Sequence, residues 1–278
     1  MLRTRLITVA VVFPLFLWAL FRLPTQYWSA LILAFMLIAA HEWARLFDFS
    51  QVTALVFALA IGAIAFALCA GGETLIPNEF VTQLLGIAAL GFWLAVVPYI
   101  LKNRIKIANN FVALLLGMVA LIPLWAALVA LQRFGPLYVF FAMGIIWLAD
   151  TAAYFSGRAF GKRKLAQDIS PGKTLEGAYG AVGIAVLYAV IFVSLGQYFG
   201  TMSLVGLPMM IVGFVLIVVL SIEGDLFESW LKRQRGKKDS GSLFPGHGGI
   251  LDRIDSLTST MPVVALALMC CKPIWGIL

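Results

Sequence analysis

The chain has 278 residues, of which 62% are hydrophobic and only 12% are charged. Soluble domains carry about 25% charged residues, so this composition excludes an ordinary soluble protein. Apolar runs of about 18 or more residues recur, each long enough to cross a hydrocarbon core of about 30 Å. The alternating pattern of barrel strands is absent. We therefore predict an all-α, polytopic integral membrane protein.

The apolar runs predict about nine membrane-spanning helices. The first follows a basic start and resembles a secretory signal, but no Ala-x-Ala cleavage site follows it, so we expect a retained helix. Because the polar segments all lie later, we divide the chain into an N-terminal transmembrane lobe, residues 1–75, and a second transmembrane domain, residues 76–278, that carries the chemistry. The predicted spans cover about residues 6–21, 26–46, 52–70, 81–101, 111–131, 136–156, 175–199, 204–230 and 254–274.

Charge asymmetry predicts the orientation of these helices. If the N-terminus is cytoplasmic and the chain changes side at each span, every Lys and Arg except Arg22, Arg133 and Lys272 falls inside. This distribution follows the positive-inside rule. We therefore expect a multi-pass protein of the cell inner membrane with its C-terminus on the outer side. The basic residues lie between spans without a recognisable nucleic-acid-binding fold, so we expect no nucleic-acid partner.

The first polar segment runs from Asp150 to Gly177. Asp150 lies inside an apolar run, where a carboxylate is costly unless it is paired, hydrated or metal-bound, so a functional role is the default expectation. The alternative is an acid at a helix end that reaches water or pairs with Arg158. Arg158 and Lys162 could hold phosphate oxygens, although basic loops beside helices are also ordinary determinants of topology.

The run Ser170-Pro171-Gly172-Lys173-Thr174 ends where we expect a helix to begin. It does not satisfy the phosphate-binding pattern G-x-x-x-x-G-K-[ST], because no glycine precedes Gly172 at the required spacing. A helix N-terminus with a lysine and a hydroxyl nearby still favours an anion. Lys173 is therefore a candidate phosphate ligand, while Glu176 either caps the helix or balances Lys173.

The second polar segment, residues 221–255, places acids on both sides of a basic, glycine-rich turn. Asp225 and Glu228 are three residues apart, as are Asp252 and Asp255, so each pair shares a helical face. Carboxylates that converge at adjacent helix ends favour a hard divalent ion such as Mg²⁺. An Asp at a helix start is also a common N-cap, which leaves a purely structural alternative for one residue of the second pair.

His247 stands among glycines in Pro245-Gly246-His247-Gly248-Gly249. The backbone amides of such a turn can cradle an anion. The imidazole could donate to a phosphate, act as an acid or only shape the loop. His41, the other histidine, is distant in sequence, so we expect no zinc site.

These two segments together resemble the phosphatidate cytidylyltransferase family, the CDP-diacylglycerol synthases. The family pattern reads Ser, Lys-Arg, Lys-Asp, Pro-x-His-Gly-Gly and Asp-Arg-x-Asp in that order. In the second segment it is matched by Ser229, Lys232, Arg233, Lys238, Asp239, Pro245, His247, Gly248, Gly249, Asp252, Arg253 and Asp255. The earlier segment is similar to the family through Asp150, Tyr154, Gly157, Arg158, Gly161, Lys162, Ser170, Pro171, Lys173, Thr174 and Glu176.

The resemblance implies a nucleotidyltransferase of phospholipid synthesis. Such an enzyme transfers CMP from CTP to phosphatidate with the help of Mg²⁺ and forms CDP-diacylglycerol and pyrophosphate. Negative charge gathers on phosphate oxygens in the transition state, so metal ions and cations are expected to supply most of the catalysis. The resemblance further implies a polar active-site cavity that faces the cytoplasm, with CTP, phosphatidate and membrane lipid as partners, and it is compatible with a homodimer.

The resemblance also implies roles for individual residues. Mg²⁺ would be held by Asp225, Asp252 and Asp255, with room for a second metal ion such as K⁺. The catalytic set would be these three acids together with Lys238 and His247. The substrate-binding residues would be Asp150, Tyr154, Arg158, Lys162, Ser170, Lys173, Thr174, Ser229, Lys232, Arg233, Asp239, Gly248, Gly249 and Arg253.

Two other classes of function remain open from the sequence. One is a related enzyme, either a CTP-dependent lipid kinase or a CDP-alcohol phosphatidyltransferase; the latter requires Asp-Gly-x-x-Ala-Arg followed by further aspartates, which the chain lacks. The other is a transporter or channel, which would suit many spans and an intramembrane Asp150. Transporters usually show internal repeats and helices broken at mid-membrane, whereas the polar residues here gather at one face.

Overall fold

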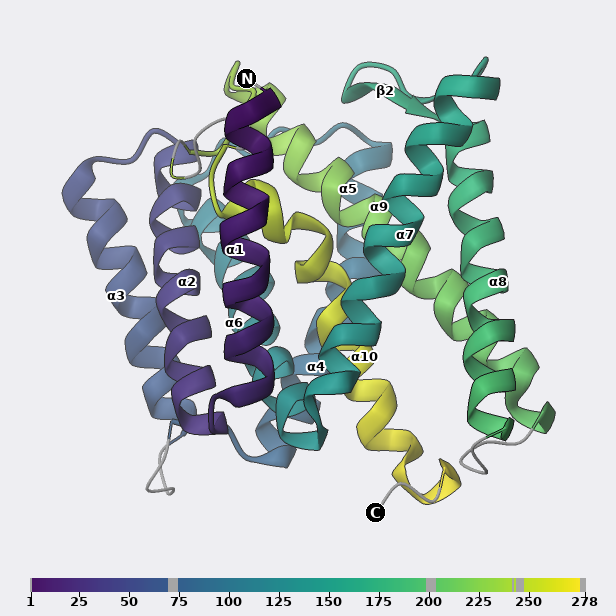
Figure 1. Ribbon diagram of the computed structural model, residues 1–278. Helices are drawn as coiled ribbons and strands as arrows, with labels where there is room; N and C mark the ends of the chain where they lie inside the picture. Colours follow the sequence, from purple (N-terminus) through teal and green to yellow (C-terminus); the bar gives the residue numbers. More distant parts are fainter. Residues whose placement is uncertain (1, 70–74, 199–203, 242, 244–247, 276–278) are drawn as a thin grey trace.

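The computed structural model describes residues 2–69, 75–198, 204–241, 243 and 248–275 (Figure 1). Its secondary structure is helical apart from one two-stranded sheet in these ranges. The elements in chain order are α1 (Leu2–Arg22), α2 (Thr25–Leu46), α3 (Gln51–Leu68), α4 (Glu79–Gly91), a π-helical turn (Phe92–Val96), α5 (Val97–Lys102), α6 (Asn110–Phe134), α7 (Pro136–Phe160), β1 (Lys164–Ala166), β2 (Ser170–Thr174), α8 (Leu175–Tyr198), a 3₁₀ turn (Leu204–Gly206), α9 (Leu207–Gln234) and α10 (Leu251–Trp275).

The prediction of a polytopic helical membrane protein is confirmed. Eight helical segments of the described chain are long and apolar enough to cross a membrane, and α1 supplies a shorter apolar helix where the first span was predicted. The fourth predicted span is α4, the π-helical turn and α5 in succession. The antiparallel pair β1 and β2 was not predicted, because its residues are polar and too few to show an alternating pattern.

Tryptophans hold α2 against α6 through hydrogen bonds to the backbone. The indoles of Trp28 and Trp43 donate to Leu128 O at 3.1 Å and to Ala113 O at 2.8 Å. Gly117 makes room for the second ring, since a Cβ there would lie 2.7 Å from Trp43 Nε1. Helices on both sides of the predicted boundary near residue 75 therefore share one core, and the division into two domains stays a prediction.

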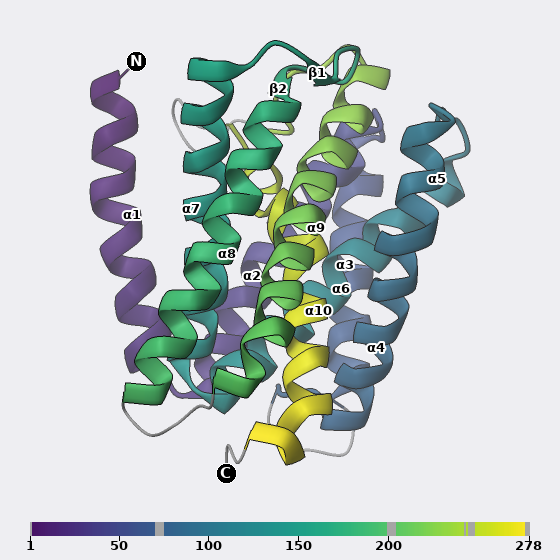
Figure 2. The same cartoon turned by 90° about the vertical axis from the view of Figure 1, so that its right-hand side faces the viewer.

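Helix α10 lies in the middle of the bundle, against α9, α6 and α4 (Figures 1 and 2). Small and hydroxyl-bearing residues allow α9 and α10 to approach closely, as is usual between membrane helices. A Cβ at Gly224 would lie 2.6 Å from Asp255 O, and the Ser259 hydroxyl donates to Leu220 O at 2.7 Å. This contact brings the acids of α9 and α10 onto facing surfaces.

An aromatic cluster fixes how α9 is rotated about its own axis. Phe227 of α9 is 1% exposed, and its ring centroid lies 5.9 Å from that of Phe92 and 5.6 Å from that of Trp93. It also packs on Trp43 of α2, with centroids 6.5 Å apart. Because aromatic side chains pack on this face of α9, the polar residues of α9 lie on a different face of the helix.

One end of the bundle carries the polar connections. The hairpin of β1 and β2, the segment between α9 and α10, and the start of α1 lie at the same end in Figure 1, whereas α10 finishes at the opposite end. The hairpin joins α7 to α8, which pack closely where a Cβ at Gly177 would lie 2.8 Å from Ala153 O. The strands pair Lys164 with Thr174 and Ala166 with Ser170.

Candidate active site

A polar cavity of about 440 Å³ lies among α7, α9 and α10. It collects acids from three helices and from the segment before α10, with an apolar part of the wall supplied by Ile146, Trp147 and Leu257. The lining residues that the sequence predicted for the site are Asp150, Asp225, Lys232, Asp239, Asp252, Arg253 and Asp255. The cavity therefore brings Asp150 of the first polar segment together with residues of the second segment.

Asp225 connects α9 to the hairpin. Its Oδ2 lies 2.6 Å from Lys173 Nζ, and its Oδ1 accepts a hydrogen bond from the Ser229 hydroxyl at 3.2 Å. Lys173 also donates to Ile222 O at 3.4 Å. The side chains of Lys173 and Asp225 are 24% and 35% exposed, so a phosphate oxygen can still reach the lysine.

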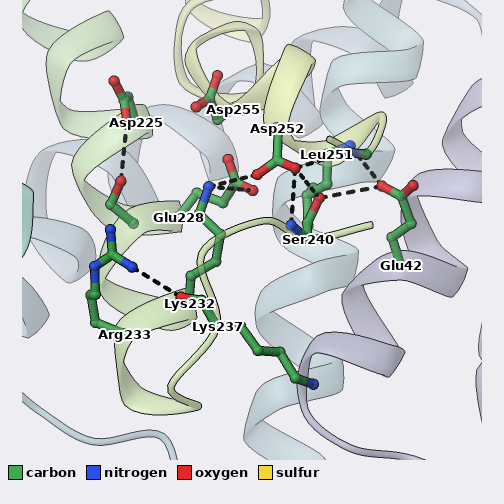
Figure 3. Close-up of polar contacts among 12 residues, drawn as sticks. Glu42, Asp225, Glu228, Lys232, Arg233, Lys237, Ser240, Leu251, Asp252 and Asp255 are labelled. Carbon is green, nitrogen blue, oxygen red and sulfur yellow. Dashed lines mark hydrogen bonds and ion pairs between the residues drawn. The ribbon is translucent and has the colours of Figure 1, made fainter. Parts of the chain in front are cut away.

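Lys232 lies between two acids and is nearly buried with them (Figure 3). Its Nζ donates to Asp252 Oδ1 at 2.6 Å and lies 3.3 Å from Glu228 Oε1. The side chains of Lys232, Asp252 and Glu228 are 10%, 5% and 4% exposed. Charges so far from water need close partners, so this triad is held as a unit.

The second oxygen of Asp252 organises the turn before α10. Asp252 Oδ2 accepts from Ser240 N at 2.9 Å, from the Ser240 hydroxyl at 3.0 Å and from Gly249 N at 2.9 Å. Gly248, with φ of 84°, adopts a left-handed conformation that favours glycine. Asp252 therefore has a structural role at the start of α10 in addition to its place in the cavity. The geometry thus supports the alternative that one residue of the pair Asp252 and Asp255 acts as a helix cap.

Asp255 and Asp150 face the same cavity from α10 and α7. Asp255 Oδ1 accepts from Ser256 N at 2.8 Å. Asp150 is exposed, ten residues before the end of α7. Both carboxylates thus line the same cavity as Asp225 and Asp252.

The remaining residues of the first segment surround the hairpin and do not line the cavity. Thr174 Oγ1 accepts from Gly177 N at 3.1 Å and caps the start of α8, and Arg158 donates to the Tyr154 hydroxyl at 3.3 Å. Ser170 pairs within the sheet, and Lys162 N donates to Glu176 Oε2 at 3.1 Å. Glu176, which we predicted either to cap this helix or to balance Lys173, thus accepts a hydrogen bond from the backbone of the loop that precedes β1.

Glu176 also binds the neighbouring arginine. Arg163 Nε donates to Glu176 Oε1 at 3.1 Å, and this hydrogen bond raises the pKa of the Arg163 guanidinium above its ordinary value. The Arg163 side chain is therefore held beside Glu176 and keeps its positive charge.

Several predicted residues of the second segment either do not line the cavity or lie outside the described residues. Arg233 is exposed and donates to Lys237 O at 3.1 Å, and Lys238 is exposed beside it. Gly248 and Gly249 do not line the cavity, but Gly249 N donates to the cavity residue Asp252 at 2.9 Å, and Gly248 lies close to Asp252 and Asp239. His247 lies outside the described residues. The roles of these residues stay predictions.

Sequence reasoning missed Glu42 of α2, which is 7% exposed and accepts from Leu251 N at 2.9 Å. The signal was present, since Glu42 is an acid inside an apolar run, as is Asp150. Ser240, which contacts Asp252, was missed as well. A serine in a polar loop carries no such signal.

The residues around the cavity suit a hard divalent cation in their chemistry. Five aspartates line it, against the two cations Lys232 and Arg253, and carboxylate oxygens are the ligands that Mg²⁺ prefers. In the described ranges, however, no three His, Cys, Asp or Glu side chains are close enough together to hold one ion. Lysines neutralise two of the acids instead, Asp225 and Asp252.

A helical membrane protein with an acid- and cation-lined cavity near one end of its spans has the features of an enzyme that acts on phosphate groups at a lipid surface. The chain belongs to the cytidylyltransferase family, whose profile matches residues 3–271. It is 39% identical to the phosphatidate cytidylyltransferase of Pseudomonas aeruginosa, over 99% of both chains. It is 37% identical to that of Haemophilus influenzae, over 94% of this chain and 96% of the relative. The predicted family is confirmed.

Proposed function

We propose that this chain is a phosphatidate cytidylyltransferase, which joins CTP to phosphatidate and releases pyrophosphate in phospholipid synthesis. The observation that carries the proposal is its similarity to the Pseudomonas aeruginosa enzyme over nearly the full length of both chains. The polar cavity supplies the acids and cations that this chemistry needs. The transporter and CDP-alcohol phosphatidyltransferase alternatives have no comparable support.

The reaction is a displacement at phosphorus. A phosphate oxygen of phosphatidate forms a bond to the α-phosphorus of CTP, while the bond from that phosphorus to the pyrophosphate oxygen breaks. Negative charge on these oxygens is stabilised by Lys173, Lys232 and Arg253. Because Asp225 and Asp252 already orient the two lysines, little rearrangement is needed as the charge develops.

On the family resemblance, Asp225, Asp252 and Asp255 are the residues that would hold Mg²⁺, with K⁺ as the candidate for a second ion, although these three carboxylates are not grouped closely enough in the described structure to hold one ion. When bound, a divalent ion would neutralise phosphate charge and polarise the reacting phosphorus–oxygen bonds. Asp225 and Asp252 each form an ion pair with a lysine, so a cation held by these acids would compete with an ammonium group for their charge. Asp255 accepts a hydrogen bond from the Ser256 backbone N–H and forms no ion pair with a lysine in the described part of the chain.

The exposed basic residues around the hairpin suit the approach of CTP. Arg158 and Lys162 are exposed at and just after the C-terminal end of α7, and Arg233 and Lys238 are exposed at and just after the C-terminal end of α9. The C-terminal ends of α7 and α9 lie at the same end of the bundle (Figure 2). A surface of one charge raises the local concentration of a polyanion such as a nucleotide. We assign these four residues to the initial binding of CTP. Lys173, at the edge of the cavity, would contact phosphate both during binding and during the reaction.

The apolar part of the wall suits the lipid substrate. Ile146, Trp147 and Leu257 line the same cavity as the aspartates. Phosphatidate must place its phosphate beside the acids and cations while its acyl chains remain in hydrocarbon. Polar and apolar lining in one cavity meets both requirements.

We place the polar end of the bundle in the cytoplasm, because the basic connections lie there with the start of α1. Single cysteines introduced in a cysteine-free background test this orientation. Lys102→Cys is expected to react with an impermeant maleimide only after inner-membrane vesicles are inverted, and Arg133→Cys only in intact spheroplasts. The reverse pattern contradicts the orientation. A homodimer is a separate proposal, tested by light scattering of the purified protein.

The activity itself is tested with purified protein, phosphatidate in mixed micelles and labelled CTP. We expect CDP-diacylglycerol and one pyrophosphate for each CTP consumed, with Mg²⁺ required. Asp252→Ala, purified in the same amount, is expected to form no product. Absence of CDP-diacylglycerol with the unmodified chain, or full activity of the variant, contradicts the proposal.

A further inference from the structure

Glu42 of α2 reaches the turn that shapes the candidate active site, although α2 contributes no lining residue to the cavity. Its Oε2 accepts from Leu251 N at 2.9 Å and lies 3.4 Å from the Ser240 hydroxyl (Figure 3). Leu251 is the first residue of α10, so its N–H has no partner within the helix. A buried carboxylate at this position satisfies that donor and suits the positive end of the helix dipole.

Ser240 connects Glu42 with Asp252. The Ser240 hydroxyl lies 3.4 Å from Glu42 Oε2 and 3.0 Å from Asp252 Oδ2. A hydroxyl has one hydrogen, so it donates to one of the two carboxylates at a time. The backbone N–H of Ser240 stays on Asp252 at 2.9 Å in either case. The segment before α10 is thus held from both sides, by Glu42 and by Asp252.

Two glycines of this segment leave the space that the Glu42 carboxylate fills. A Cβ added at Gly241 would overlap Glu42 Oε1, and one added at Gly249 would overlap Glu42 Oε2. Around Gly241, the three atoms nearest to such a Cβ all belong to Glu42. The close approach is therefore specific to this acid.

We propose that Glu42 is a positioning residue for Asp252: by holding Leu251 and Ser240 it sets the start of α10 and thereby the direction of the Asp252 carboxylate. The proposal rests on the proposed function, because Asp252 acts there on substrate phosphates. It assigns to the N-terminal part of the chain a direct part in building the active site.

The first test compares Glu42→Ala and Glu42→Gln in the CDP-diacylglycerol assay. We expect kcat to fall about 10- to 100-fold in the alanine variant, the usual effect of losing a residue that orients an active-site ligand, with KM for CTP little changed. Gln keeps an oxygen that can accept from Leu251 N, so its kcat should lie between those of the alanine variant and the unmodified chain. Hydrogen exchange of the 236–255 segment should rise in the same order.

Thr25→Val is the matched control. Thr25 is also on α2, and its hydroxyl donates to Gln132 Oε1 at 2.7 Å near the opposite end of the helix. This variant loses one hydrogen bond between α2 and α6 and should leave kcat unchanged. A general loosening of α2 would lower kcat in both Thr25→Val and Glu42→Ala.

The second test uses the space between Glu42 and Gly241. Gly241→Ala should lower kcat in the unmodified background, because the new methyl group overlaps the Glu42 carboxylate. In the Glu42→Ala background the same substitution should cost little more, since the acid is gone. Equal effects in both backgrounds would overturn the proposal.

The outcomes separate the two hypotheses. If the unmodified chain forms no CDP-diacylglycerol, the proposed function fails, whereas hydrogen exchange still reports whether Glu42 holds the turn. If the unmodified chain is active and both Glu42 variants keep its kcat, the positioning role is overturned. If Glu42→Ala does not fold, the Gln variant decides: lower kcat at unchanged thermal stability supports the proposal, and unchanged kcat overturns it.

Discussion

Lys173 and Asp225 form an ion pair between β2 and α9, with Nζ and Oδ2 2.6 Å apart. The pair joins the first polar segment of the sequence to the second. It leaves both side chains partly exposed, so the lysine is oriented without being withdrawn from a substrate. The hairpin therefore places the ammonium group of Lys173 at the edge of the acidic cavity.

Replacement of Lys173 tests whether this cation acts on phosphate. Lys173→Ala is expected to lower kcat about 100-fold, because one donor to the developing charge is lost. Lys173→Arg keeps the charge but changes its geometry, and should recover only part of the activity. Lys102→Ala, which removes an exposed cation at the end of α5, is the control and should behave as the unmodified chain. Steady-state kinetics with CTP varied would show the differences, and equal kcat values would exclude a phosphate contact by Lys173.

Removal of the metal tests the role of the aspartates. Chelation with EDTA is expected to abolish CDP-diacylglycerol formation, and added Mg²⁺ should restore it in the unmodified chain. Asp255→Asn removes one carboxylate of the cavity, so we expect a higher Mg²⁺ concentration for half-maximal activity. Asp168→Asn is the matched control, because Asp168 is 56% exposed and pairs with Arg104 on the hairpin side. The same Mg²⁺ dependence in both variants would count against Asp255 as a ligand.

The sequence predicted the helices well because the apolar runs are long and the bilayer fixes their length. The second polar segment likewise led to Asp225, Asp252 and Asp255, which line one cavity. The hairpin that carries Lys173 was missed, since short polar strands leave no periodic pattern. Glu42 carried a signal, as an acid inside an apolar run, but its partners Leu251 and Ser240 are remote in sequence, so its role became visible only from the packing of α2.

Removal of Lys232 tests the buried triad. Lys232→Met leaves Glu228 and Asp252 close together without their shared cation, which should lower the free energy of unfolding by about 3–5 kcal/mol. Adding Glu228→Gln in the same background removes one of the two like charges and should recover part of the loss. Titration with SDS in mixed micelles measures the order of stability. Equal stability of Lys232→Met and the unmodified chain would mean that these acids are solvated or neutral rather than paired.

Substitution of Gly224 tests whether the distance between α9 and α10 sets the geometry of the site. A Cβ at Gly224 would lie 2.6 Å from both Asp255 O and Ser259 Oγ, so Gly224→Ala must separate the helices or shift them along each other. We expect about 1–3 kcal/mol of destabilisation from overpacking. We also expect at least a tenfold loss of kcat, because Asp255 moves relative to Asp225.

The control for this substitution is on the same helix. A Cβ at Gly213 would meet no atom within 4 Å, so Gly213→Ala makes the same chemical change without the clash. Since Ala is favoured over Gly in a helix interior, this variant should be as stable as the unmodified chain or slightly more stable, with unchanged kcat. The contrast between the two glycines separates the helix–helix contact from any general effect of removing a glycine from α9. If Gly224→Ala lowers stability but keeps full kcat, the close approach supports the fold without setting the positions of the aspartates.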